Sequence, residues 1–219
     1  MTNGPHDHGY SPGRHGSGNV TDVSNRTGRR HDPAISQALF QAAERIMASD
    51  GFSELTVDGL VTEVGTTRPA FYRRYRSIAR LALEVVLKRY GNAPPSDTGD
   101  LRADLLALQR NDVAMMTSPL LRFNLPALFE AMRTDETIRE MYLESFISPR
   151  RENVAAVLSA AQKRGEISAE DVDAEYICDL LFGPLLARVL LPTSLPLNDF
   201  IARKTVATVL REIGSSMAD

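Results

Sequence analysis

Residues Leu55–Ser77 read LTVDGLVTEVGTTRPAFYRRYRS, and this stretch decides how the chain folds. Thr56 is a good N-cap, and apolar residues follow it at helical spacing. Gly65 interrupts this pattern, as a residue able to take a positive φ at a helix end would. Two threonines then offer a second N-cap, and Pro69 falls in a first turn, where proline is tolerated. The stretch therefore predicts two short helices joined by a tight turn.

The second of these helices has an apolar side and a basic side. Phe71 and Tyr75, four residues apart, supply the buried side. The other residues lie on or beside the opposite side: Arg68, Tyr72, Arg73 and Arg74. A helix pair whose second member is basic is typical of a helix-turn-helix that reads DNA.

Charge is divided unevenly along the chain. The 219 residues carry a net charge of −3, which taken whole argues against a nucleic-acid-binding protein. Residues 1–90 nevertheless hold 12 Lys/Arg against 9 Asp/Glu, giving +3, while residues 91–219 hold 13 against 19, giving −6. Within residues 66–90 there are seven basic residues and one acid, Glu84. This polarity fits a chain that docks one end on phosphate and keeps the other end off the DNA.

The stretch resembles the DNA-binding region of the tetracycline-repressor (TetR) family of transcriptional regulators. The residues that carry the resemblance are Ala42–Ala43, Gly51–Phe52, Leu55–Thr56–Val57, Leu60, Gly65, Phe71–Tyr72 and Tyr75, with Ser77 opening a further helix. The match covers about residues 30 to 90, and beyond it the likeness is a looser, all-helical one. The resemblance implies a double-stranded DNA operator, a homodimer and a small-molecule effector as partners.

Two positions depart from the family pattern. Gly59 lies inside the first helix of the pair, where glycine costs roughly 1 kcal/mol against alanine. Ile78 stands where the family commonly has a lysine that touches phosphate, so Arg76 or Arg80 is expected to supply that charge.

The predicted DNA contacts come from hydrogen-bond donors and cations around the second helix. Arg68 lies at its exposed start and is placed to reach a guanine edge, while Arg73 reads a base or holds a phosphate. The full predicted set is Thr56, Thr67, Arg68, Ala70, Tyr72, Arg73, Arg74 and Arg76. The alternative for these arginines is an ordinary solvated surface.

The chain divides into three predicted parts. Residues 1–30 are polar and rich in Gly and His, and we expect a disordered tail whose arginines either follow the DNA or are a solvated linker. Residues 31–90 form the helix-turn-helix domain with a linking helix. A break at 91–99 opens residues 91–219, a helical domain for effector binding and dimerisation.

The whole chain is predicted to be all-α. After the break we expect helices at about 100–117, 119–133, 135–164, 171–191 and 196–214. Pro126 is expected to kink or split the second of these, and Ser148–Pro149 to bend the third.

Two sets of apolar residues in the second half are candidates for binding. The family pocket lies among such helices, and large pliable side chains suit an apolar effector. The pocket candidates are Met115, Met116, Phe123, Phe129, Met132, Tyr142, Phe146, Tyr176 and Phe182. The candidates for a dimer interface on the last two helices are Ile177, Leu181, Leu185, Val206, Leu210 and Ile213. For both sets the alternative is ordinary core within one chain.

These features predict a homodimeric repressor that a small apolar ligand releases from its operator. The alternatives are a helix-turn-helix regulator controlled by a protein partner, or a helical protein-interaction module. No catalytic residues, metal site or cofactor are expected, because all four histidines lie in or beside the tail and no enzyme motif is present. With one cysteine and no apolar run long enough for a membrane span, we expect a cytoplasmic protein.

Overall fold

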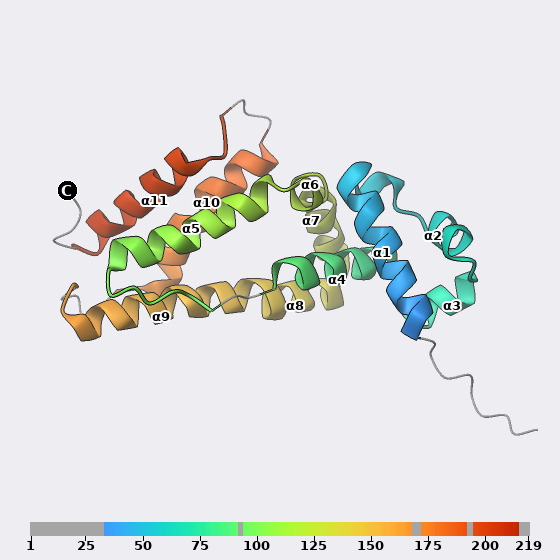
Figure 1. Ribbon diagram of the computed structural model, residues 1–219, viewed down its shortest axis with the longest axis horizontal. Coiled ribbons are helices and arrows are strands. Elements are labelled where there is room, and N and C mark those ends of the chain that lie inside the picture. The colour runs from blue at the N-terminus through green and yellow to red at the C-terminus, as the bar shows by residue number, and fades with distance from the viewer. Residues whose placement is uncertain (1–32, 92–93, 168–171, 192–194, 215–219) are drawn as a thin grey trace, which may run out of the picture. The chain divides into compact units, whose positions relative to one another are not determined.

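The computed structural model describes residues 33–91, 94–167, 172–191 and 195–214. Every regular element in these ranges is helical, which confirms the all-α prediction (Figure 1). The predictions for the tail, residues 1–30, lie outside the described residues. No helix in the described ranges is long and apolar enough to cross a membrane.

The N-terminal helices follow the predicted caps closely. α1 (Pro33–Ser49) ends before Gly51, whose φ is 86°, and a short 3-10 turn, η1 (Phe52–Glu54), follows. α2 (Val57–Val64) ends at Gly65, which takes the left-handed conformation with φ 70°. α3 (Arg68–Tyr72) and α4 (Ile78–Tyr90) come next.

The second half begins with one long helix and three short ones. α5 (Leu101–Thr117) is followed by α6 (Pro119–Arg122), α7 (Leu125–Thr134) and α8 (Glu136–Tyr142). The expected helix at 119–133 is thus split, as Pro126 indicated. The split comes at Asn124, whose buried amide donates to Met47 O at the end of α1 at 2.8 Å.

Three longer elements complete the chain. A π-helical turn, η2 (Leu143–Ile147), joins α8 to α9 (Ser148–Arg164). This irregularity falls where Ser148–Pro149 predicted a bend, because a proline nitrogen has no hydrogen to continue the regular pattern. α10 (Ala174–Leu190) and α11 (Asp199–Glu212) follow, and both are a few residues shorter than expected.

Helix packing produces two buried clusters. α1 packs on α2, α4 and α6, while α5, α9, α10 and α11 pack on one another (Figure 1). One cluster runs from the α1–α4 helices into α6–α8, and the other lies inside the α5–α11 bundle. The first cluster therefore contains apolar residues from both sides of the break at 91–99, whereas the second contains only residues that follow it.

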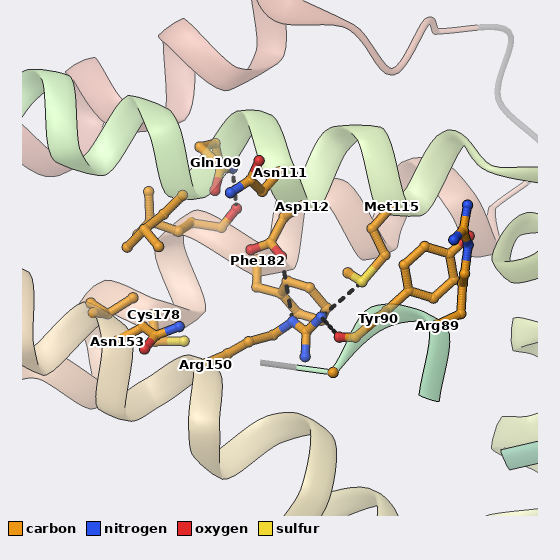
Figure 2. Close-up of a pocket in the computed structure, with 14 residues that line it drawn as sticks. Arg89, Tyr90, Gln109, Asn111, Asp112, Met115, Arg150, Asn153, Cys178 and Phe182 are labelled. Atoms are coloured by element: carbon orange, nitrogen blue, oxygen red, sulfur yellow. Dashed lines mark hydrogen bonds and ion pairs between the residues drawn. The ribbon is translucent and has the colours of Figure 1, made fainter. Parts of the chain in front are cut away.

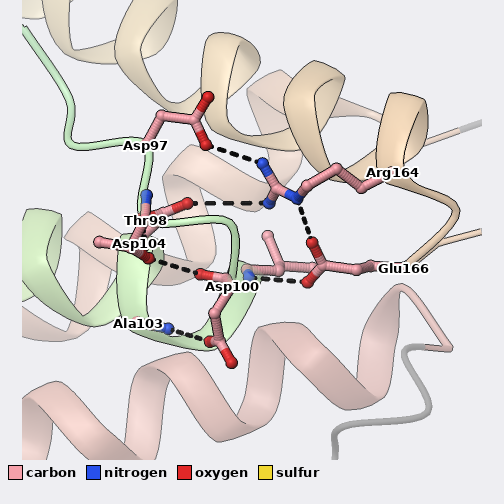
Figure 3. A network of polar contacts seen from close by, with 8 residues as sticks. Asp97, Thr98, Asp100, Ala103, Asp104, Arg164 and Glu166 are labelled. Carbon is pink, nitrogen blue, oxygen red and sulfur yellow. Dashed lines mark hydrogen bonds and ion pairs between the residues drawn. The ribbon is translucent and has the colours of Figure 1, made fainter.

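A polar network fixes the start of α5 to the end of α9 (Figure 3). Asp104 is 1 % exposed and accepts from Thr98 Oγ1 at 2.7 Å. Arg164 donates to Asp97 at 2.9 Å and to Glu166, which in turn accepts from Leu101 N at 2.7 Å. These charge-assisted bonds hold α5 and α9 together at this end of the bundle.

Candidate nucleic-acid interface and core cavity

Both helices of the helix-turn-helix begin with a threonine cap. Thr56 Oγ1 accepts from Gly59 N at 3.1 Å, and Thr67 Oγ1 accepts from Ala70 N at 3.3 Å. A Cβ at Gly59 would lie 3.0 Å from Thr56 Oγ1, so glycine lets this cap close tightly. The threonine caps predicted from the sequence are confirmed, and both side chains lie at the exposed end of a helix.

Arg68 connects the two helices of the pair. Its NH1 group donates to both carboxylate oxygens of Asp58 on α2, at 3.1 Å each. Hydrogen bonding to Tyr72, followed by the charge of Asp58, raises the pKa of Arg68. The guanidinium is exposed but already paired, so a contact with a base would have to form beside or in place of this ion pair.

Arg74 turns inward, away from the surface assigned to it. Its Nε donates to Ser36 Oγ at 3.0 Å and its NH1 to Ala70 O at 2.8 Å. The neighbouring Tyr75 donates its hydroxyl hydrogen to Ser36 O at 3.2 Å. Both side chains therefore tie the turn after α3 to α1, and the predicted phosphate contact of Arg74 does not fit this arrangement.

Arg73 and Arg76 differ from Arg74. Both are exposed, and neither side chain makes a hydrogen bond or ion pair within the part of the chain that the structure describes. Tyr72, 44 % exposed, lies beside them on the last turn of α3. Arg80, the other candidate for the missing lysine charge, donates to Glu84 at 3.2 Å. The unpaired positive charge of this region thus gathers at Arg73 and Arg76.

The second helix of the pair ends before most of the basic residues that were predicted to lie on it. α3 ends at Tyr72, so Arg73 and Arg76 lie in the turn between α3 and α4 instead of on the helix. Ala70 also needs a correction, because its side chain is 7 % exposed and packs inside the domain. Its methyl group has almost no surface to offer to DNA.

A cavity of about 290 Å³ lies where the end of α4 meets α5, α9 and α10 (Figure 2). Its size is close to the lower limit for small-molecule sites. The wall is mixed: apolar residues such as Met115 and Phe182 alternate with Gln109, Asp112 and Arg150. Residues that line it are Arg89, Tyr90, Gly91, Leu108, Gln109, Asn111, Asp112, Met115, Arg150, Asn153, Val154, Cys178, Leu181 and Phe182.

Arg150 is the centre of the polar contacts in the cavity. Its side chain is only 15 % exposed, and its guanidinium carbon lies 3.7 Å from the centroid of the Phe146 ring. Its nitrogens donate to Phe146 O at 2.8 Å, to Tyr90 O at 3.4 Å and to Met115 Sδ at 2.8 Å. Since Tyr90 is the last residue of α4, Arg150 joins the wall of the cavity to the end of that helix.

Asp112 is the acidic partner of Arg150. Its Oδ1 accepts from Arg150 Nε at 3.4 Å, a long contact, and its side chain is 22 % exposed. Burial raises the pKa of Asp112 to about 6, although the positive charge of Arg150 opposes the shift. The carboxyl is therefore mostly ionised at neutral pH.

Two neighbours of this pair are neutral. Burial raises the pKa of the Cys178 thiol to about 11, so the cysteine is an uncharged part of the wall. Burial also raises the pKa of Tyr142 to about 12, and its hydroxyl has no hydrogen-bond partner among the described residues. Among the described residues, the charged groups that line the cavity are therefore Asp112, Arg150 and Arg89.

The predicted pocket residues are only partly brought together. Met115 and Phe182 line the cavity, while Met116 is buried in the core and borders a second hollow of about 350 Å³ beside Leu197. The aromatic rings of Phe129, Tyr142 and Phe146 pack on one another next to the cavity without lining it. The remaining candidates are Met132, which is core, and Phe123 and Tyr176, which are 54 % and 48 % exposed.

The predicted dimer residues lie on the wrong face of their helices. Ile177, Leu181, Leu185, Val206, Leu210 and Ile213 are all buried within a single chain, at most 7 % exposed. They form core between α10, α11 and their neighbours, which was the alternative assignment. Their side chains leave no surface for a second copy.

The polar residues of the cavity, above all Asp112 and Arg150, were missed because large apolar side chains were taken as the sign of a pocket. A signal was nevertheless present. Asp112 falls on the spacing of Leu101, Leu105 and Leu108, so a charge interrupts the apolar stripe of α5.

Comparison with known proteins places both parts of the chain in one family. The family model for bacterial regulatory proteins, tetR family, matches residues 39–85, and the model for a tetracyclin repressor-like C-terminal domain matches residues 95–209. The second match alone covers more than half of the chain. It includes α5, α9 and α10, which supply most of the cavity wall.

Relatives and solved structures agree with this assignment. YdeS of Bacillus subtilis strain 168, a helix-turn-helix type transcriptional regulator, is 25% identical over 197 residues, which are 90% of this chain and 98% of YdeS. Rv1556, a regulator of the same type from Mycobacterium tuberculosis H37Rv, is 28% identical over 167 residues, 74% of this chain and 80% of that protein. The crystal structure of the TetR family regulator SCO0332 superposes with a TM-score of 0.62 at 28% identity, covering 81% of this chain and 97% of that one.

These relatives are transcriptional regulators of the helix-turn-helix type. The capped helix pair, the helical bundle that follows it and the family matches along both parts support the same assignment. The chain thus belongs to the TetR family of DNA-binding transcriptional regulators.

Proposed function

We propose that this regulator is a homodimeric repressor that leaves its operator when a small molecule fills the cavity at the end of α4. The observation that carries this proposal is the bond from Arg150, in the cavity wall, to Tyr90 O, the last carbonyl of α4. A molecule that moves Arg150 alters the support of the helix that follows the helix-turn-helix. The mechanism is a population shift towards a geometry in which two copies no longer fit successive major grooves, about 34 Å apart.

The DNA-binding surface consists of the exposed side chains around α3. Arg73 and Arg76 supply cations for phosphate or base edges, and Tyr72 and Thr67 supply hydroxyl groups. Arg68 contributes from the start of α3, where its guanidinium is paired with Asp58 in the free protein. Arg74 and Ala70 support this surface from inside.

The dimer interface we propose is the exposed face of α10. Tyr176, Leu180, Gly183, Ala187 and Leu190 follow one another at helical spacing, and all five are exposed or half-buried in the single chain. Small residues in the middle of this stripe allow two helices to approach closely, and the larger residues at its ends add apolar area. The residues assigned to the interface from the sequence lie on α10 and α11, whereas this stripe lies on the outer side of α10 alone.

A gel shift with the DNA upstream of the chain's own gene tests the function. Sequence-specific binding that weakens steeply with salt supports a repressor, and indifference to sequence and salt contradicts it. Thermal-shift screening of small molecules, followed by gel-shift release, then tests the cavity. Specific binding that no stabilising ligand releases would instead favour control by a protein partner.

Sedimentation of Ala187→Arg tests the interface. The position is exposed in the single chain and arginine is a good helix former, so the variant should fold yet sediment as a monomer. Ala156→Arg, at an exposed alanine of α9, is the matched control and should stay dimeric. A dimer that survives Ala187→Arg would place the interface elsewhere.

A further inference from the structure

The cavity contains a carboxylate whose capacity to accept hydrogen bonds is almost unused. An ionised carboxylate offers about four lone-pair sites. Within the described residues Asp112 fills one of them, with the 3.4 Å contact from Arg150 Nε. Figure 2 shows this carboxyl group directed from α5 towards Arg150 across the cavity. The side chain of Asp112 is 22 % exposed, so its remaining acceptor sites are open to the cavity and leave room for a donor from a bound molecule.

The guanidinium of Arg150 is in the opposite state. Beyond Asp112 it already has two carbonyl oxygens, a methionine sulfur and the face of the Phe146 ring as partners. An anionic ligand would have to replace these contacts and would also face the negative charge of Asp112. Around Asp112 and Arg150 the polar wall is therefore better prepared for a donor than for an acceptor.

Gln109 supports the same conclusion from deeper in the wall. Its Nε2 donates to Leu181 O at 2.7 Å and to Thr205 Oγ1 at 2.9 Å, which fixes the orientation of the amide. Its side-chain oxygen has no donor among the described residues, and it belongs to a residue that lines the cavity. Both Asp112 and Gln109 thus offer free acceptor capacity.

We propose that the effector is an amphipathic amine whose N–H groups bind Asp112 while its apolar body packs against Met115, Leu181 and Phe182. This inference rests on the proposed function and names the chemical class of its ligand. The amine binds Asp112 beside the long contact from Arg150 Nε and shares the negative charge of the carboxylate with Arg150. Its binding therefore alters the position of Arg150 and, through the bond from Arg150 to Tyr90 O, the support of the end of α4.

Four probes with one phenethyl-type body separate charge from hydrogen bonding. They are phenethylamine, its N,N,N-trimethyl derivative, phenethyl alcohol and hydrocinnamate. Thermal shift and calorimetry on the full chain should give the primary amine the tightest binding, at least about 10-fold tighter than hydrocinnamate. The trimethyl derivative should bind more weakly than the primary amine, because it has the charge without an N–H donor.

Two variants then locate the binding. Asp112→Asn should weaken phenethylamine binding by about 10-fold or more and remove the preference over the alcohol. Glu130→Gln, the same change of carboxylate to amide at an exposed residue of α7, should leave all four affinities unchanged. The probe series on the unaltered chain tests the inference even if Asp112→Asn does not fold.

The outcomes distinguish this inference from the function on which it rests. Equal affinities for the four probes, or no binding of any at about 10 mM, would overturn the amine assignment. Operator binding in the gel shift would then still stand. Phenethylamine binding that depends on Asp112 but leaves operator affinity unchanged would support the amine site and contradict ligand-controlled release.

Discussion

The DNA-binding surface and the cavity both contain arginines, but the two regions differ in how buried and how paired these arginines are. Arg73 and Arg76, in the turn after α3, are exposed and have no partner in the described part of the chain. Arg150, in the core, is mostly buried and surrounded by partners on every side. An unpaired, hydrated guanidinium remains available for phosphate, whereas a buried and paired one holds helices together and responds when a partner changes. The burial and the pairing of each arginine, more than the number of positive charges, therefore distinguish the proposed DNA-binding surface from the proposed ligand cavity.

The largest effect is expected when the buried arginine is removed. Arg150→Met leaves Asp112 without its counter-ion and takes a donor from Tyr90 O and Phe146 O. Breaking a buried pair in this way costs about 3–5 kcal/mol of unfolding free energy. Urea denaturation of Arg150→Met beside Arg73→Ala measures the contrast, because the exposed arginine should change stability by less than about 0.5 kcal/mol. Similar losses of unfolding free energy in the two variants would contradict the contrast between the buried arginine and the exposed one.

The second effect concerns DNA affinity. Arg73→Ala should weaken specific binding by about 10- to 100-fold and leave folding and dimerisation intact. Arg133→Ala removes an exposed arginine on α7 and serves as the control. Fluorescence anisotropy at one fixed salt concentration measures both variants. Affinity equal to that of the unaltered chain would show that Arg73 does not contact DNA.

The third effect is a pH dependence of stability. Asp112 faces Arg150 of α9, Tyr142 of α8 and Cys178 of α10, and burial raises its pKa from 3.8 to about 6. A raised carboxyl pKa means that the folded state holds the proton more tightly, so the favourable contribution is complete below pH 4 and is lost as the pH rises through about 6.

The Asp112→Asn variant has no carboxyl group at this position, so its stability does not fall as the pH rises through about 6. Between pH 4 and pH 7 the stability of Asp112→Asn should therefore rise relative to the unaltered chain, by about 1–3 kcal/mol. Urea unfolding of both proteins across this range measures the difference. A difference that stays constant with pH would mean that the carboxyl has an ordinary pKa.

The smallest effect tests the pair between α2 and α3. Asp58→Asn removes an exposed negative charge beside the proposed DNA surface and leaves Arg68 without its partner. Stability should hardly change, because exposed ion pairs contribute little, while DNA affinity should rise by roughly 2- to 5-fold at low salt. Anisotropy at two salt concentrations measures this. Weaker binding would instead mean that Asp58 orients Arg68 for a base contact.

The sequence predicted the helix-turn-helix well because its signals are local. Thr56, Thr67 and Ser77 cap helices and Gly65 ends one, and each acts within a few residues of its own position. The inward turn of Arg74 was not predictable in this way, since its partner Ser36 lies 38 residues away.

In the core, contacts between residues far apart in the sequence were even harder to predict. Apolar spacing on α10 identified a helix with a buried face, but periodicity alone does not say whether that face meets the same chain or a second copy. The cavity pair was closer to being predictable. Asp112 interrupts the apolar stripe of α5, and Arg150 interrupts a stripe formed by Phe146 of η2 and by Val154 and Val157 of α9. Two opposite charges on two apolar stripes indicate a buried pair.

The most direct test is the salt dependence of binding to the DNA upstream of the chain's own gene, with and without Arg73 and Arg76. The unaltered chain should bind specifically, with affinity falling steeply as salt rises. Arg73→Ala combined with Arg76→Ala should reduce the slope of log affinity against log salt by roughly 2 per chain bound. An unchanged slope and affinity would contradict the assignment of this turn as the DNA-binding surface.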